Sequence, residues 1–157
     1  MSYKKPFLII KLLSLILIVS AFYSCDDHQN QITELSKNRQ LWESKQISSY
    51  IINESLSCYC GGVLDWELRV EDEIKIAVNF DESQLPSSET YETILERART
   101  INNIFDFIES LENQDTESLE VQYNSTYGFP ISISVDYNRQ VADDEFYYSF
   151  TNFNLLD

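Results

Sequence analysis

Residues 63–80 read VLDWELRVEDEIKIAVNF, and this stretch decides the fold class. Between Leu64 and Val70 every second residue is apolar, and every residue between them is charged. This period of two is typical of a β-strand that buries one face and exposes the other to water. Asp72 marks a tight turn. The apolar positions after the turn are Ile74, Ile76, Val78 and Phe80. The stretch therefore predicts an antiparallel hairpin with one apolar face.

A further extended run precedes this hairpin. Its apolar face consists of Tyr50, Ile52, Leu56, Cys58 and Cys60. Glu54 is the exception, because its carboxylate falls on that same face. Burial raises the pKa of such a carboxyl group, and an arginine such as Arg69 is the partner that we expect for it.

The same alternation returns in three stretches after residue 113, namely 119–123, 131–137 and 146–150. The polar side of these strands carries Ser132, Ser134, Tyr147 and Ser149. This far face of the predicted sheet is a candidate binding surface, although an ordinary wetted face has the same composition.

Two regions show helical spacing of apolar residues. The first runs from Ile32 to about Ser44, and the second covers 89–108 as one long helix or as two helices with a break near Thr100. Helix and three strands thus occur twice in succession. This order predicts an α+β fold: an antiparallel sheet of about six strands with helices on one face, built from a candidate duplicated helix-strand-strand-strand unit.

The first 24 residues have the order of an export signal. Two lysines, Lys4 and Lys5, precede a mostly apolar run that ends at Ser24 and is followed by Cys25. Bacterial lipoprotein signals end in this way, so we expect residues 1–24 to be cleaved and Cys25 to carry lipid. An uncleaved membrane anchor is the alternative. Residues 25–31 then form a polar tether, and residues 32–157 form a single α+β domain.

Charge narrows the choice of partners. The leader holds three of the 11 basic residues, which leaves eight against 26 acidic ones, a net charge of −18 for the mature chain. Nucleic acid is a poor partner for such a surface, whereas a protein or another cationic partner suits it. Strong acidity also serves solubility alone. Asp26 and Asp27 directly after the lipidated cysteine favour a cell-envelope location at the outer membrane.

Cysteine and histidine usage limits the chemistry. With Cys25 assigned to lipid, Cys58 and Cys60 remain as a pair, and the single histidine, His28, falls in the tether. The pair is a structural disulfide, two partly buried thiols, or a redox-active couple. Two sulfurs alone cannot complete a metal site, so we expect neither metal nor cofactor.

Catalytic residue sets are missing from the sequence. A histidine-based triad and a glycine-rich phosphate loop are both absent, so we expect a protein that is not an enzyme. The acidic turn 136–145 offers oxygen ligands for calcium, but it lacks the spacing of an EF-hand loop, and a solvated turn is the simpler interpretation.

Several short motifs occur together in an order that resembles the bacterial secreted and lipoprotein family catalogued as domain of unknown function 6174. They are Trp42, Tyr50, Cys58-Tyr59-Cys60, Thr100-Ile101, Phe105, Ile108, Tyr127-Gly128-Phe129-Pro130, Ile133, Asp136 and Asp144-Glu145. The resemblance implies the fold and export but no reaction. It makes candidate binding residues of Tyr127, Gly128, Phe129, Pro130, Asp136, Asp144 and Glu145. At Asp72-Glu73 the family tends to have glycine.

The sequence therefore favours a lipid-anchored envelope protein that acts as a non-catalytic binding or interaction module. A thiol-redox accessory protein that uses Cys58 and Cys60 is one alternative. An inhibitor-like module that binds proteins is another, by analogy with the repeated architecture of beta-lactamase-inhibitor proteins.

Overall fold

The computed structural model describes residues 26–59, 62–84, 86, 89–138, 140–141 and 143–156. The chain divides into two compact units, Met1–Glu34 and Leu35–Asp157. The described part of the first unit is the start of helix α2 (Asp26–Ser44), so the residues predicted as a tether are helical from Asp26. The predicted export signal, the lipidation site Cys25 and the second cysteine of the pair, Cys60, lie outside the described residues.

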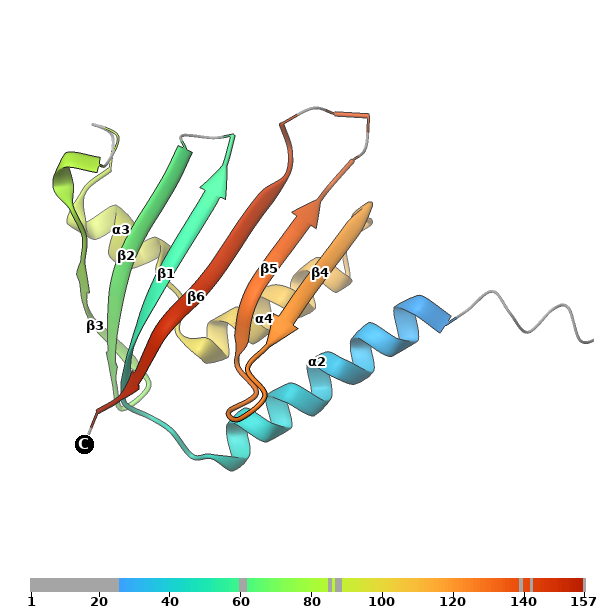
Figure 1. The fold of residues 1–157 in the computed structure, drawn as a ribbon, viewed down its shortest axis with the longest axis horizontal. Coiled ribbons are helices and arrows are strands. Elements are labelled where there is room, and N and C mark those ends of the chain that lie inside the picture. Colours follow the sequence, from blue (N-terminus) through green and yellow to red (C-terminus); the bar gives the residue numbers. More distant parts are fainter. Residues whose placement is uncertain are drawn as a thin grey trace, which may run out of the picture. The chain divides into compact units, whose positions relative to one another are not determined.

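Six strands form one antiparallel sheet in the second unit, as the alternating sequence predicts (Figure 1). They are β1 (Tyr50–Cys58), β2 (Gly62–Glu71), β3 (Ile74–Asn79), β4 (Ser118–Tyr123), β5 (Pro130–Asp136) and β6 (Phe146–Leu155). Their order across the sheet is β3-β2-β1-β6-β5-β4. The first and last strands of the unit therefore pair at its centre, and this long-range pairing joins the two sets of three strands.

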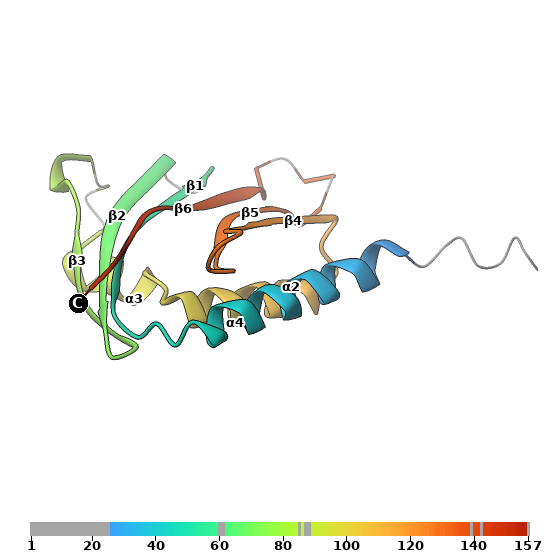
Figure 2. The same cartoon turned by 60° about the horizontal axis from the view of Figure 1, so that its bottom comes forward.

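Helices cover one face of this sheet (Figure 2). They are the part of α2 from Leu35 onward, α3 (Tyr91–Arg97) and α4 (Ile101–Glu112), and a short 3-10 helix, η1 (Glu82–Gln84), follows β3. Five apolar residues on one face of α4 are buried: Ile101, Ile104, Phe105, Ile108 and Leu111. They pack on the alternating apolar residues of the strands, among them Ile52, Leu68, Ile133 and Phe150. The fold is thus the predicted α+β class.

The second helical region is two helices and not one. Thr100 caps α4, because its hydroxyl accepts a hydrogen bond from the Asn103 N–H at 3.2 Å. The end of α3 is satisfied from the sheet, since Nζ of Lys75 donates to the carbonyls of Leu95, Glu96 and Ala98 at 2.6, 3.2 and 2.9 Å. Lys75 on β3 therefore stabilises the break between α3 and α4, which is one of the two alternatives that the sequence allows.

The role of Lys75 explains a wrong prediction in β3. The sequence places Ile74 and Ile76 on the buried face, but they are 63% and 46% exposed. The pairing of β2 with β3 shifts register between Arg69 and Val70, so Lys75 lies opposite the buried Val70. One inserted residue reverses the faces of the strand. The bulge directs the ammonium group toward the helix end and exposes the two isoleucines.

The repeat of helix and three strands is one of element order and not of strand path. Because all neighbouring strands are antiparallel, β1 and β4, the first strands of the two sets, run in opposite directions. Across the sheet, however, β2 lies on the same side of β1 as β5 does of β4. Because the helices cover the same face in both sets, the two three-stranded units have opposite handedness and cannot be superposed by a rotation.

The turn between β2 and β3 uses two left-handed residues. Asp72 has φ of 48° and Glu73 has φ of 67°, and Glu71 pairs with Ile74 across them. A two-residue hairpin with positive φ at both positions is a type I′ turn, for which glycine is preferred at the second position. Glu73 lies in the turn where the family that the sequence resembles tends to have glycine, and its backbone conformation is strained.

We predict that Glu73→Gly stabilises the protein by about 0.5–1 kcal/mol, because glycine adopts this φ without the steric cost of a Cβ. The N–H of residue 73 still reaches the Ser48 carbonyl, which it contacts at 2.8 Å. The free energy of unfolding in urea measures the effect. Glu73→Ala is the control: it also removes the charge but keeps the Cβ, and an equal gain from it would contradict the conformational explanation.

Candidate functional site

The most unusual side chain of the sheet is the buried carboxylate of Glu54. It lies on the helix-covered face of the central strand β1 and is 1% exposed. Its direct neighbours across the sheet are Trp66 on β2 and Phe150 on β6, both buried. A carboxylate among aromatic rings is costly to bury unless hydrogen bonds compensate for the lost water.

Two donors supply this compensation. The Tyr148 hydroxyl on β6 donates a hydrogen bond to Oε2 of Glu54. The backbone N–H of Arg99, in the connection between α3 and α4, donates to both oxygens at 3.2 Å. The prediction that Arg69 pairs with Glu54 is wrong, because Arg69 is paired instead with its neighbour Glu71 at 2.6 Å. Arg69 lies in register with Ile51 and not with Glu54, so the alternation of β1 and β2 places it on the opposite face.

Burial raises the pKa of Glu54 to about 7, as the sequence suggests for a carboxyl group on an apolar face. The hydrogen bonds from Tyr148 and from the Arg99 N–H favour the ionised form and offset part of this effect. The indole N–H of Trp66 acts in the same direction at longer range, since within the described part of the chain it forms no hydrogen bond of ordinary geometry. Burial, followed by the Glu54 charge, raises the pKa of Tyr148 well above its usual value.

A pocket of about 300 Å³ adjoins this cluster, and we call it the Arg99 pocket. Its lining residues are Leu56, Cys58, Arg97, Arg99, Phe107, Asp143, Asp144, Glu145, Phe146 and Tyr148. Both donors to Glu54, Tyr148 and Arg99, belong to the lining, whereas Glu54 itself does not. The buried Glu54 carboxylate therefore holds two lining residues of the pocket, Tyr148 and Arg99, through hydrogen bonds, although it does not line the pocket itself.

The charged residues that line the Arg99 pocket differ in whether they have an ion-pair or hydrogen-bond partner. Arg97 forms an ion pair with Glu89 at 2.9 Å. The guanidinium of Arg99 lies over the Phe107 ring, 4.2 Å from its centroid, and no ion pair with another described residue is found for it. Oδ1 of Asp144, another lining residue, is buried and has no hydrogen-bond partner in the described part of the chain. The lining of the pocket thus combines aromatic residues with the charged residues Arg99 and Asp144, and the Oδ1 of Asp144 is enclosed by the protein.

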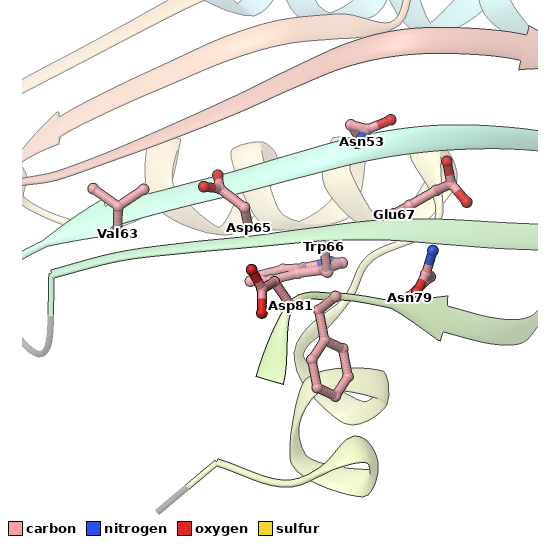
Figure 3. A pocket seen from close by; sticks show the side chains of 8 residues that line it. Asn53, Val63, Asp65, Trp66, Glu67, Asn79 and Asp81 are labelled. Atoms are coloured by element: carbon pink, nitrogen blue, oxygen red, sulfur yellow. The ribbon is translucent and has the colours of Figure 1, made fainter. Parts of the chain in front are cut away.

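A second pocket, of about 510 Å³, contains strand residues of the opposite, uncovered face of the sheet (Figure 3). Asn53, Asp65, Glu67 and Asn79 approach it from β1, β2 and β3, and Asp81 follows β3. Amides and carboxylates suit a cationic or hydroxylated ligand. Among the residues that the structure describes, however, no three histidine, cysteine or acidic side chains gather as a metal site.

The candidate binding residues from the sequence fall into two groups at opposite ends of the β1–β6 pair. Tyr127 and Phe129 belong to an aromatic cluster with Trp42 and Phe153, where the Phe129 and Phe153 ring centroids are 4.7 Å apart. Gly128 has φ of 85°, and a Cβ there would lie 2.4 Å from the Asn38 carbonyl oxygen. These residues, with the buried Pro130 that begins β5, serve the packing of α2 from Leu35 onward.

The remaining candidates lie near the other end. Asp144 and Glu145 line the Arg99 pocket together with Cys58. Asp136 ends β5, and its Oδ1 is buried without a hydrogen-bond partner among the described residues. The four residues of the predicted far face, Ser132, Ser134, Tyr147 and Ser149, are direct neighbours across β5 and β6.

Sequence reasoning missed the residues that make the pocket distinctive, namely Arg99, Phe107 and Tyr148. Tyr148 lies in the alternating stretch 146–150, whose pattern indicates no partner for it, and Phe107 interrupts the helical spacing of α4. The available signal was the pair of cations Arg97 and Arg99 close to the predicted break near Thr100.

We predict that the stability of the protein falls by about 3 kcal/mol between pH 4.5 and pH 7 through Glu54 alone. In this window the unfolded carboxyl group has ionised while the folded one retains its proton, so the folded state binds more protons and a rise in pH destabilises it. Glu54→Gln removes this contribution. Urea unfolding at several pH values measures it, with the outer-face Glu67→Gln as the control. Parallel curves for the wild type and Glu54→Gln would contradict the assignment.

Comparisons with other proteins identify a family but no activity. Within the described residues, no helix has both the length and the apolar character needed to cross a membrane. Neither the curated proteins nor the solved structures contain a match to the chain. Residues 34–155, which include the whole sheet and the Arg99 pocket, match the profile described as a family of unknown function, DUF6174. This protein therefore belongs to the DUF6174 family.

Proposed function

We propose that this protein is a lipid-anchored protein of the bacterial cell envelope, attached through Cys25 to the outer membrane, and that it acts by binding a ligand and not by catalysis. The order of lysines, apolar run, Ser24 and Cys25 supports the anchor. Its net charge of −18 after cleavage argues against nucleic acid as the ligand.

The observation that carries the binding function is the Arg99 pocket. It is concave, its walls are mainly aromatic and aliphatic, and a few polar groups converge on it, which are the usual properties of a small-ligand site. Its walls are preorganised, because the Glu54 carboxylate holds the Tyr148 hydroxyl and the Arg99 backbone in place. A site whose walls are fixed before binding loses less entropy when a ligand enters.

The position of Glu54 also favours binding over acid–base catalysis. Its pKa near 7 would suit a general acid or base. Such a group must reach the proton that it transfers, however, and Glu54 is 1% exposed behind Tyr148 and the Arg99 backbone. The carboxylate therefore acts on the pocket through its two hydrogen-bonded neighbours.

We predict that Cys25→Ser abolishes incorporation of labelled palmitate and releases or mislocalises the protein, because the acylated thiol is lost. Cys58→Ser is the control, since it removes a cysteine outside the leader and should retain the label. Unchanged labelling of the Cys25→Ser variant would show that the leader is not a lipoprotein signal.

A thiol-redox role is the rival proposal, because Cys58 lines the pocket. Under the binding function we expect the Cys58–Cys60 pair to have a reduction potential below roughly −300 mV, the range of structural disulfides. Equilibration in thiol buffers of known potential, followed by trapping and mass measurement, gives this value. A potential near that of thiol oxidoreductases would support the redox role instead.

A further inference from the structure

We propose that the edge of strand β2 at Val63–Trp66, which we call the β2 edge, binds an extended basic segment of a partner protein. The segment joins the sheet as an additional strand beside β2. The site lies at the second pocket, of about 510 Å³, and not at the Arg99 pocket. The two sites take different ligands, so either can exist without the other.

Strand β2 is longer than the strand that covers its outer side. On its inner side β1 pairs with all but the last residue of β2. On the outer side the pairing with β3 starts only at Glu67, opposite Asn79. Figure 3 shows β2 continuing past the end of β3, with Val63 and Asp65 beyond it. Within the described part of the chain, the β2 edge therefore has a strand neighbour on one side only.

The backbone of the β2 edge offers hydrogen-bonding groups to an added strand. Glu71 and Ile74 flank the two-residue turn and so form a hydrogen-bonded pair. Every second residue of an antiparallel strand directs both its N–H and its C=O to the same neighbour. The groups of Val63 and Asp65 therefore face the side on which β3 has ended. Among the described residues, neither a strand nor a loop pairs with them there, and a peptide strand completes such a ladder.

The second pocket supplies the space for this strand. It lies between the β2 edge and the point where the chain leaves β3, at Asn79, Phe80 and Asp81. Four extended residues span about 13 Å, which is the length of β2 that β3 leaves uncovered. The occupant is therefore a short extended segment and not a helix.

The charges around the β2 edge favour a basic segment. Asp65 is exposed and Glu67 is half-buried, and both belong to the uncovered face of the sheet. Asp81 adds a third carboxylate, and no lysine or arginine is among the described lining residues. Lysine or arginine side chains on the same face of an added strand lie beside these carboxylates, and opposite charges on neighbouring strands attract.

The other face of the added strand meets apolar side chains. Trp66 is 2% exposed on the helix-covered face of β2. Phe80, which also lines the pocket, packs against the core with its ring 6.4 Å from that of Tyr91. Because successive side chains of a strand point to opposite faces, a segment that alternates basic and apolar residues fits this position.

Titration of the mature full-length protein in nanodiscs of phosphatidylcholine, a lipid without net charge, tests the charge preference. The probes are pentapeptides with blocked ends, in which three valines alternate with two lysines, two serines or two glutamates. We predict that the lysine peptide binds at least tenfold more tightly than the glutamate peptide, with the serine peptide between them. Equal affinities, or no binding of the lysine peptide beyond that of empty nanodiscs, would overturn the proposal.

Two N-methylated forms of the lysine peptide test strand pairing without any change to the protein. One carries methyl groups on the lysine amides and the other on the valine amides. A docked strand bonds to its neighbour through the amides of every second residue, so only one form should lose affinity, by at least tenfold. Equal effects in both forms would show that the peptide does not pair with a strand edge.

Protein variants then locate the site. Val63→Pro removes an N–H on the outer side of β2 and leaves the pairing with β1 in place, so it should abolish binding, whereas Val63→Ala keeps the N–H and should retain it. Asp65→Asn should weaken the lysine peptide but not the serine peptide, and Glu120→Gln, on the distant strand β4, is its control. Undiminished binding by a folded Val63→Pro variant would place the site elsewhere. If urea unfolding shows that this variant is not folded, the Asp65→Asn result assigns the site, and an equal effect on both peptides would refute it.

Discussion

The second unit depends on the way in which strand β1 holds the connection between α3 and α4. The Glu54 carboxylate accepts hydrogen bonds from the Arg99 backbone N–H and from the Tyr148 hydroxyl, and the Tyr50 hydroxyl accepts one from the Ile101 N–H at 2.8 Å. The orphan N–H groups around the start of α4 are thus satisfied by side chains of the central strand. The raised pKa values of Glu54 and Tyr50 reflect chiefly burial, which is the cost of placing these polar anchors inside the core.

This arrangement explains why a pocket forms beside the buried cluster. The backbone N–H of Arg99 donates a hydrogen bond to the buried Glu54, whereas the Arg99 side chain stacks on the Phe107 ring. Tyr148 likewise uses its hydroxyl for Glu54 and presents its ring to the pocket. The polar network is satisfied internally, and the side chains that remain free to meet a ligand are the arginine head group and the aromatic walls.

The correct predictions concern properties that neighbouring residues decide. Alternation in 63–71 places Leu64, Trp66 and Leu68 in the core, and the apolar spacing of α4 predicts its buried face. The wrong predictions concern residues whose surroundings depend on how distant segments pair. Ile74 and Ile76 are exposed because Lys75 turns toward the end of α3, and Arg69 does not pair with Glu54 because the register of β1 and β2 places the two residues on opposite faces of the sheet.

The sequence by itself determined the α+β class, the faces of most strands, the burial of Glu54 and, through its motifs, the resemblance to the family that the profile of residues 34–155 establishes. Only the tertiary structure decided the strand order, the break before Thr100 and the Arg99 pocket. Periodicity reports which face of an element is apolar, because that depends on adjacent residues. A pocket depends on which distant segments meet, and here Cys58, Arg99 and Asp144 converge only because β1 pairs with β6 beneath the start of α4.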